Sequence, residues 1–192
     1  YVSKNSTQRS ILLMGLIIAA HFASYTYIAP FLVQQAGFSA GTITLTLLGF
    51  GLLGMLANFL VSASVTRHLQ LSLGAAVVLM LLALVSLPFV VGNDLGVGAA
   101  VLVWGVAYGA IPLALSTWMQ LTSPRLAEAS SAMLVTTFQV AIASGSLLGG
   151  VIVDGYGMAQ TLFFGALLGL LGLVVMATFG FGQDRLIEKL QR

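Results

Sequence analysis

Long runs of apolar residues alternate with short polar or glycine-rich breaks along the whole chain. A helix needs about 20 mainly apolar residues to cross a hydrocarbon core that is roughly 30 Å thick. Six runs meet this requirement and predict an all-α polytopic membrane protein. The predicted transmembrane helices are Ile11–Val33, Ile43–Val65, Leu71–Val91, Val97–Met119, Ser130–Val153 and Thr161–Phe181.

The segments outside the apolar runs complete the predicted organisation. Residues 1–10 are polar and are interpreted as a cytoplasmic linker cut from a longer protein. Residues 11–181 form the six-helix unit, and residues 182–192 are predicted to be a cytoplasmic tail with a short amphipathic helix at the membrane surface. Glycines recur four residues apart within the spans, a spacing that favours close helix packing in lipid. These pairs are Gly105 with Gly109, Gly145 with Gly149, and Gly165 with Gly169.

The composition agrees with a membrane protein. Hydrophobic residues make up 59% of the chain and charged residues only 6%, against roughly a quarter charged in an ordinary soluble domain. A net charge of +2 carried by so few ionisable groups gives no reason to expect a nucleic-acid partner. The sequence has no cysteine, which excludes disulfides and thiolate metal sites.

The basic residues fall on one side of an even-numbered topology. Lys4 and Arg9 precede the first span, Arg67 lies between the second and third, and Arg125 between the fourth and fifth. Three more basic residues follow the sixth span. The opposite loops contain no Lys or Arg, and their only charged residues are Asp94 and Asp154. Cytoplasmic loops collect Lys and Arg during insertion. We therefore expect a multi-pass protein of the bacterial inner membrane with both termini in the cytoplasm.

Three stretches of the chain are similar to a known family. They are "AHFASYTYIAPFLVQQAGFSA", "GLLGMLANFLVSASVTRHL" and "SPRLAEASSAMLVTTFQVAIASGSLLGGVIVDGYG". Together they resemble the C-terminal half of a major facilitator superfamily transporter, of the bacterial drug and sugar efflux type. The resemblance implies one half of a twelve-helix fold, built as a 3+3 inverted repeat. It also implies an N-terminal six-helix half as partner, and proton-coupled efflux of small amphipathic solutes by alternating access.

The chain departs from the family pattern in two places. The loop after the second span often contains Asn-x-x-x-Gly-x-x-x-Asp-Arg in the family. The corresponding residues here are Asn58, Ser62, Thr66 and Arg67, so the acidic residue is missing. The fifth span, where the pattern usually has Asn, carries Gln139 instead.

Polar residues within the first span are candidates for a binding site, because polar groups in lipid are costly unless they are paired or hydrated. His21, Ser24 and Tyr25 recur at helical spacing and are expected to share a face. His21 could contact substrate or take part in proton-linked gating, since imidazole titrates near neutral pH. Alternatively, it could simply bond to a neighbouring helix.

Further candidates lie in the fourth and fifth spans. Trp104 and Tyr108 are four residues apart and suit a pocket for an amphipathic ligand, although packing is the alternative role. Trp118, near the end of the fourth span, is expected in the interfacial aromatic belt. Gln139 and Thr136 in the fifth span could bind a substrate hydroxyl. The resemblance places the first and fourth helices at the cavity wall, and these carry four of the candidate residues.

Three residues are candidates for gating. Pro30 and Pro112 each remove a backbone donor and are expected to kink or loosen their helices. Arg67 is either a solvated topology signal or a latch that pairs with the other half of the transporter.

Other function classes fit the sequence less well. A serine protease would need a carboxylate to orient His21, and the chain has no His–Glu cluster for a metal. We therefore expect neither an enzyme nor a bound cofactor or metal. A six-span channel or a self-assembling membrane module is the alternative to a transporter, but the loops are too short for re-entrant filters.

Overall fold

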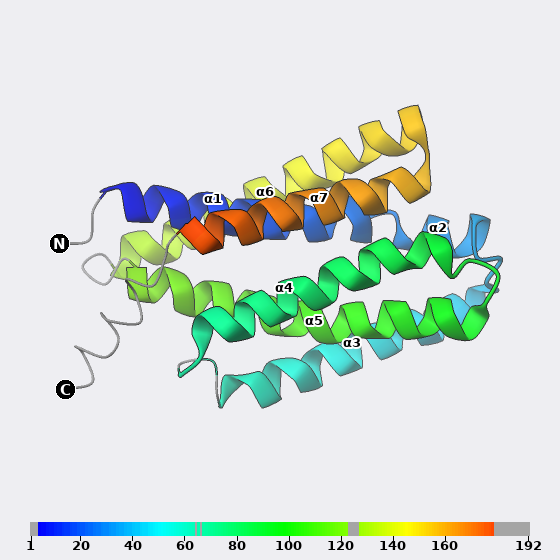
Figure 1. Ribbon diagram of the computed structural model, residues 1–192, viewed down its shortest axis with the longest axis horizontal. Helices are drawn as coiled ribbons and strands as arrows, with labels where there is room; N and C mark the ends of the chain where they lie inside the picture. Colours follow the sequence, from blue (N-terminus) through cyan, green and yellow to red (C-terminus); the bar gives the residue numbers. More distant parts are fainter. Residues whose placement is uncertain (1–3, 64, 66, 123–126, 179–192) are drawn as a thin grey trace.

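Helices account for the regular structure of this protein. A computed structural model describes residues 4–63, 65, 67–122 and 127–178, in which no strand occurs (Figure 1). Six helical stretches in these residues are long and apolar enough to cross a membrane, so the predicted all-α, six-span architecture is confirmed. The elements are α1 (Lys4–Tyr25), α2 (Ile28–Gln34), α3 (Ala40–Ser62), α4 (Leu69–Ser86), the short 3₁₀ helix η1 (Leu87–Phe89), α5 (Asp94–Thr122), α6 (Ala127–Tyr156) and α7 (Met158–Thr178).

The helix ends differ from the predicted span limits. Helix α1 begins at Lys4, ahead of the predicted Ile11, because hydropathy marks only the stretch that crosses hydrocarbon and the helix continues beyond it. The second span ends at Ser62 and does not reach the predicted Val65. Residues 179–192, which include the end of the predicted sixth span and the predicted tail helix, lie outside the described residues.

The first span is interrupted near its C-terminal end, as its proline predicts. Helix α1 ends at Tyr25, and α2 continues the span from Ile28 after a two-residue turn. Pro30 cannot donate a hydrogen bond, and its ring clashes with the carbonyl four residues earlier, which is that of Thr26. Pro112, by contrast, lies within α5, which continues through it.

The six spans form two groups of three that exchange their first helices. Helix α1 packs against α6 and α7, and α5 packs against α3 and α4 (Figure 1). The two groups meet where α4 contacts α7 and α1 contacts α5. In chain order, the first helix of each triplet therefore packs on the second and third helices of the other triplet. This reciprocal pattern is consistent with the 3+3 repeat, which loop lengths alone do not reveal.

Glycines allow α5 to approach α3 at backbone contact. A Cβ atom added at Gly105 would lie 2.8 Å from the Cα atom of Phe50, and one at Gly109 would overlap backbone atoms of Gly54. Such contact has no room for a side chain on α5. The small residues four apart thus fix how α5 is rotated and how deep it lies against α3.

The same kind of contact joins α6 to α1. A Cβ atom at Gly145 would lie 2.7 Å from the carbonyl oxygen of Ala19, and one at Gly149 would overlap the carbonyl oxygen of Ala23. The two contacts fix the register between these parallel helices. Each residue of α6 lies level with the α1 residue whose number is 126 lower, as Gly145 does with Ala19. The α1–α6 and α5–α3 interfaces therefore correspond to each other. In both, the first helix of one triplet packs on the second helix of the other triplet.

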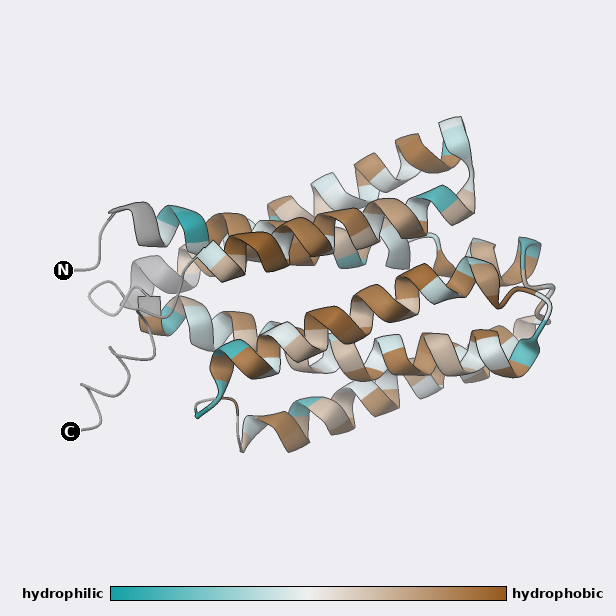
Figure 2. Cartoon of the chain, in the orientation of Figure 1, coloured by the Kyte–Doolittle hydropathy of each residue, from teal (hydrophilic) through white to brown (hydrophobic). Residues whose placement is uncertain are grey.

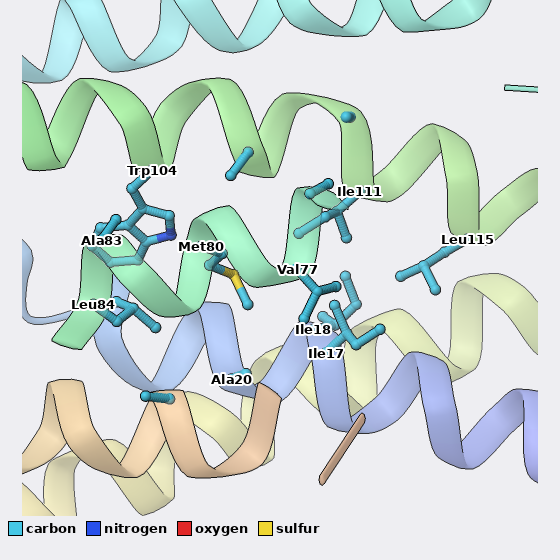
Figure 3. Close-up of a cluster of buried hydrophobic side chains, with 14 of the residues drawn as sticks. Ile17, Ile18, Ala20, Val77, Met80, Ala83, Leu84, Trp104, Ile111 and Leu115 are labelled. Atoms are coloured by element: carbon cyan, nitrogen blue, oxygen red, sulfur yellow. The ribbon is translucent and has the colours of Figure 1, made fainter. Parts of the chain in front are cut away.

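The core lies where α1, α4 and α5 converge. Figure 3 shows Ile17 and Ile18 of α1 facing Val77 of α4, with Trp104 and Ile111 of α5 alongside. Helices α3 and α6 flank this core and are the least buried of the six spans. The hydropathy colouring in Figure 2 places the most hydrophilic residues near the two ends of the bundle.

The two ends of the bundle differ in charge. The start of α1 and the α3–α4 connection lie at one end, and the α4–α5 and α6–α7 connections lie at the other (Figure 1). Arg9 and Arg67 belong to the first end, whereas Asp94 and Asp154 belong to the second. The side chains of the remaining basic residues lie outside the described part of the structure; they are Lys4, Arg125, Arg185, Lys189 and Arg192.

Gly109→Ala is expected to destabilise the protein, because the new Cβ atom would overlap the backbone of Gly54 and push α5 away from α3. Overpacking of this kind costs about 1–3 kcal/mol. Thermal unfolding of the purified protein in detergent should show a lower midpoint. Gly98→Ala is the matched control, since it lies on the same helix with open space around the added atom. Equal midpoints for the two variants would contradict the proposed packing.

Candidate functional site

His21 is enclosed between two tyrosine rings in the middle of the bundle. Its side chain is 1% exposed. The imidazole stacks on Tyr108 with ring centroids 3.3 Å apart and planes 6° apart, and on Tyr25 at 4.9 Å and 18°. The indole Nε1 of Trp104 donates a hydrogen bond to the imidazole Nδ1 at 3.2 Å. Four residues predicted from the sequence, two from α1 and two from α5, thus meet at His21, which contacts the other three.

Two phenylalanines complete this aromatic cluster, which we define as His21, Phe22, Tyr25, Phe50, Trp104 and Tyr108. Phe50 comes from α3 and stacks on Tyr25 at 5.0 Å and 30°. It also meets the edge of Trp104 at 5.8 Å and 89°. Sequence reasoning missed Phe50, because one more apolar residue in a long apolar helix gives no signal of its own. The glycine contacts between α3 and α5 bring it into the cluster.

The tyrosine hydroxyls are the accessible polar groups of the cluster. Tyr25 and Tyr108 are half-buried, and no described residue forms a hydrogen bond with either hydroxyl. No fully buried polar side-chain atom in the described structure lacks a partner, so both hydroxyls reach open space. A ligand could therefore meet an aromatic face and a hydroxyl at each tyrosine. Trp104, in contrast, is fully buried in the core.

Ser24 lies on a different side of α1 from the cluster. It is fully buried, and its hydroxyl donates to the carbonyl oxygen of Thr161 on α7 at 3.4 Å. Its Oγ atom occupies the space beside Gly165, where a Cβ atom would overlap it. The expected shared face with His21 is therefore not formed. A turn of 60° around the helix separates residues three apart, and here that turn directs them to different neighbours.

Gln139 and Thr136 are exposed on α6 and do not meet the cluster. The register of α6 against α1 places Gln139 level with residue 13 of α1. It lies eight residues from His21 along the axis, which is about 12 Å at 1.5 Å per residue. Both residues lie on the side of His21 that is nearer the start of α1.

The candidate gating residues occupy separate positions. Pro112 follows Tyr108 by four residues, so the carbonyl of Tyr108 loses its usual helical donor. Nearby, the amide of Asn58 on α3 donates to the carbonyl of Gly109 at 3.0 Å and bridges the two helices. Arg67 is exposed in the connection between α3 and α4.

The sequence suggested that Trp118 belongs to an interfacial aromatic belt. The structure contradicts this prediction. Trp118 is 1% exposed, and its indole donates to the hydroxyl of Ser10 at 3.2 Å. It therefore joins α5 to α1 at a point nearer the start of α1 than the aromatic cluster. The prediction rested on the position of Trp118 near the end of the fourth span. That position does not determine the direction in which the side chain points.

Comparisons with known proteins relate the chain to a group of bacterial exporters. No family model matches it. The purine ribonucleoside efflux pumps NepI of Salmonella paratyphi C and Salmonella typhimurium are each 34% identical over 178 residues. The corresponding pump of Salmonella enteritidis PT4 is 33% identical over 177 residues. In each case 88% of this chain is covered, and it spans 44% of the length of the relative.

The chain is homologous to the C-terminal half of a major facilitator superfamily transporter. As a transporter half of this superfamily it is a multi-pass membrane protein, and its six spans agree with the fold. The resemblance noted in the sequence is therefore confirmed. The aromatic cluster lies on the first and fourth spans of this transporter half, with Phe50 added from the second.

Asn58→Leu is expected to weaken the contact between α3 and α5, because the amide donor to the Gly109 carbonyl is lost. Hydrogen bonds between membrane helices contribute about 0.6 kcal/mol on average. The thermal unfolding midpoint of the purified protein should fall by a small but measurable amount. Ser62→Ala, one turn along the same helix, is the control because its hydroxyl bonds within α3 to Phe59. A larger loss in the control would refute the bridging role.

Proposed function

We propose that the chain is the C-terminal half of an efflux transporter that exports purine ribonucleosides or similar planar, amphipathic solutes. The N-terminal six-helix half is its partner, and the two halves rock about a central site in alternating access. Proton entry drives the export. The protein resides in the bacterial inner membrane with both termini in the cytoplasm. The homologous Salmonella pumps are purine ribonucleoside efflux pumps, which supports the solute class.

The half-buried tyrosines carry this proposal. Tyr25 and Tyr108 offer aromatic faces for a flat base and hydroxyls that can bond to its edge or to a sugar. Pockets for small molecules combine apolar walls with a few polar groups of this kind. This chemistry suits a nucleoside better than a sugar alone, because a sugar has no planar ring to stack. We therefore propose purine ribonucleosides as the solute class, in place of the drugs and sugars expected from the sequence.

The distribution of exposed polar residues supports a hydrated cavity between α3 and α6. Polar side chains exposed to lipid are costly. Exposed polar residues within the spans nevertheless occur on α3, as Thr44 and Asn58, and on α6, as Thr136 and Gln139. The exposed residues of α4 between 71 and 86 and of α7 between 161 and 177 are all apolar. We infer that α4 and α7 face lipid, whereas α3 and α6 face the cavity and the partner half.

Within this cavity Gln139 and Thr136 lie nearer the cytoplasm than the aromatic cluster. We propose that they contact the solute on its way to the tyrosines. The interruption at Pro30 and the missing helical bond at Pro112 allow α1 and α5 to bend during opening and closing. We propose that Arg67 pairs with the partner half and so helps to hold the cytoplasmic side of the transporter closed.

Tyr108→Ala is expected to raise the KM for export of a radiolabelled purine ribonucleoside about tenfold, since it removes a stacking face and a hydroxyl. Export is measured as uptake of the nucleoside into inverted membrane vesicles that contain the full transporter, with equal protein amounts verified by immunoblot. Phe89→Ala is the control, because this aromatic residue is 76% exposed and lies far from the cluster in sequence and structure. An unchanged KM for Tyr108→Ala would exclude the tyrosine from the solute site.

The orientation can be tested with single cysteines, because the chain has none of its own. In a cysteine-free full transporter, Asn93→Cys between η1 and α5 should react with a membrane-impermeant maleimide added to intact cells. Arg67→Cys should react only after the cells are permeabilised, since basic loops stay in the cytoplasm. Equal labelling of both positions in intact cells would contradict the proposed topology.

A further inference from the structure

The hydrogen bond between Trp104 and His21 fixes the protonation state of the imidazole. An indole N–H can only donate, so the Nδ1 atom of His21 must accept with its lone pair. An imidazolium has a proton on both nitrogens and cannot accept this bond. The observed contact therefore requires the neutral imidazole with its proton on Nε2.

Among the side chains that the structure describes, no charged group is in contact with the imidazole. The titratable side chains in ring contact with it are Tyr25 and Tyr108, and the other contacting rings are Phe22, Phe50 and Trp104. Helices α3, α4 and α7 contain no Asp, Glu, Lys or Arg.

Three charged residues on the other helices have side chains that the structure describes, and all three lie near helix ends. Along the helix axes, Arg9 is about 18 Å from His21, Asp94 about 15 Å and Asp154 about 10 Å, at 1.5 Å per residue. A carboxylate that could pair with a cationic His21 is therefore absent from the described surroundings.

The same bond also fixes the plane of the imidazole. The ring of His21 is parallel to that of Tyr108 within 6° and to that of Tyr25 within 18°. A histidine ring held by stacking alone could rotate about its Cβ–Cγ bond, since this torsion is broad. The Trp104 bond removes that freedom, so the tyrosine on each side meets a flat surface of defined orientation.

We propose that His21 is a positioning residue that stays neutral, with its proton on Nε2, and holds Tyr25 and Tyr108 parallel for a planar solute. The coupling proton is carried by other groups. This inference rests on the proposed function for the nature of the solute, but the protonation state of His21 can be determined without any transport.

The first test reads the protonation state directly. The full transporter is labelled with ¹⁵N at histidine, reconstituted in liposomes and measured by solid-state NMR between pH 5 and 8. The signals that disappear in His21→Gln belong to His21. We expect a neutral ring with protonated Nε2 throughout this range. An imidazolium signal, or a proton on Nδ1, would overturn the proposal, even if the vesicles export no purine ribonucleoside and the proposed function fails.

The second test separates positioning from proton transfer in transport. His21→Phe and Trp104→Phe should each raise the KM for purine ribonucleoside export roughly three- to tenfold, the effect of one lost hydrogen bond. The double variant should add little, because both changes remove the same bond. The pH profile of the maximal rate should keep its shape in all three variants. Loss of the pH dependence in His21→Phe would identify His21 as a proton carrier and refute the proposal.

Trp118→Phe is the matched control for these variants. It removes an indole bond from α5 to α1 of the same length, but to Ser10 and away from the tyrosines. Its KM should equal that of the unmodified transporter. A similar rise in KM for Trp118→Phe would mean that any loosening of the α1–α5 contact impairs the site, which would refute a specific role for His21.

Discussion

Backbone contact at small residues is the constraint on which the rest of this structure depends. In lipid, helices gain little by burying apolar side chains against one another, so close packing must hold them together. Gly109 against Gly54 and Gly149 against Ala23 provide that packing at two equivalent interfaces. Because these contacts leave no room for adjustment, they determine the rotation of α5 and α6. The directions in which the side chains of those two helices point, including Trp104 and Tyr108 on α5, follow from this rotation.

The aromatic cluster shows how one polar contact can organise an apolar interior. The hydrogen bond between Trp104 and His21 joins α5 to α1 within the aromatic cluster, and the bond from Trp118 to Ser10 joins the same two helices elsewhere. The bond between Trp104 and His21 satisfies two buried polar groups that would otherwise be costly in lipid. The rings around it gain a common orientation, and the tyrosine hydroxyls remain for other partners. The residues that stabilise the centre of the bundle are thus the same ones that we propose for recognition of the solute.

The sequence predicted the large features of the fold because they follow from one-dimensional rules. Span number follows from apolar length, and the sidedness of Arg9 and Arg67 follows from counting spans. The helices of the aromatic cluster were also predicted, since polar residues in a span are rare. The partners were harder to predict: Phe50 carries no signal, Ser24 turns to α7, and Gln139 lies two turns away. Helical periodicity gives a face but not the neighbour that covers it.

The exchange of first helices between the triplets has a consequence for biosynthesis. When α1 leaves the ribosome, α5, α6 and α7 have not been made, so the helices of this chain that cover its packing surface and bury His21 are still missing. This helix therefore cannot reach its final contacts within the chain while more than half of the chain is still being translated. Assembly of the bundle therefore cannot proceed one helix at a time, and the last span completes the first.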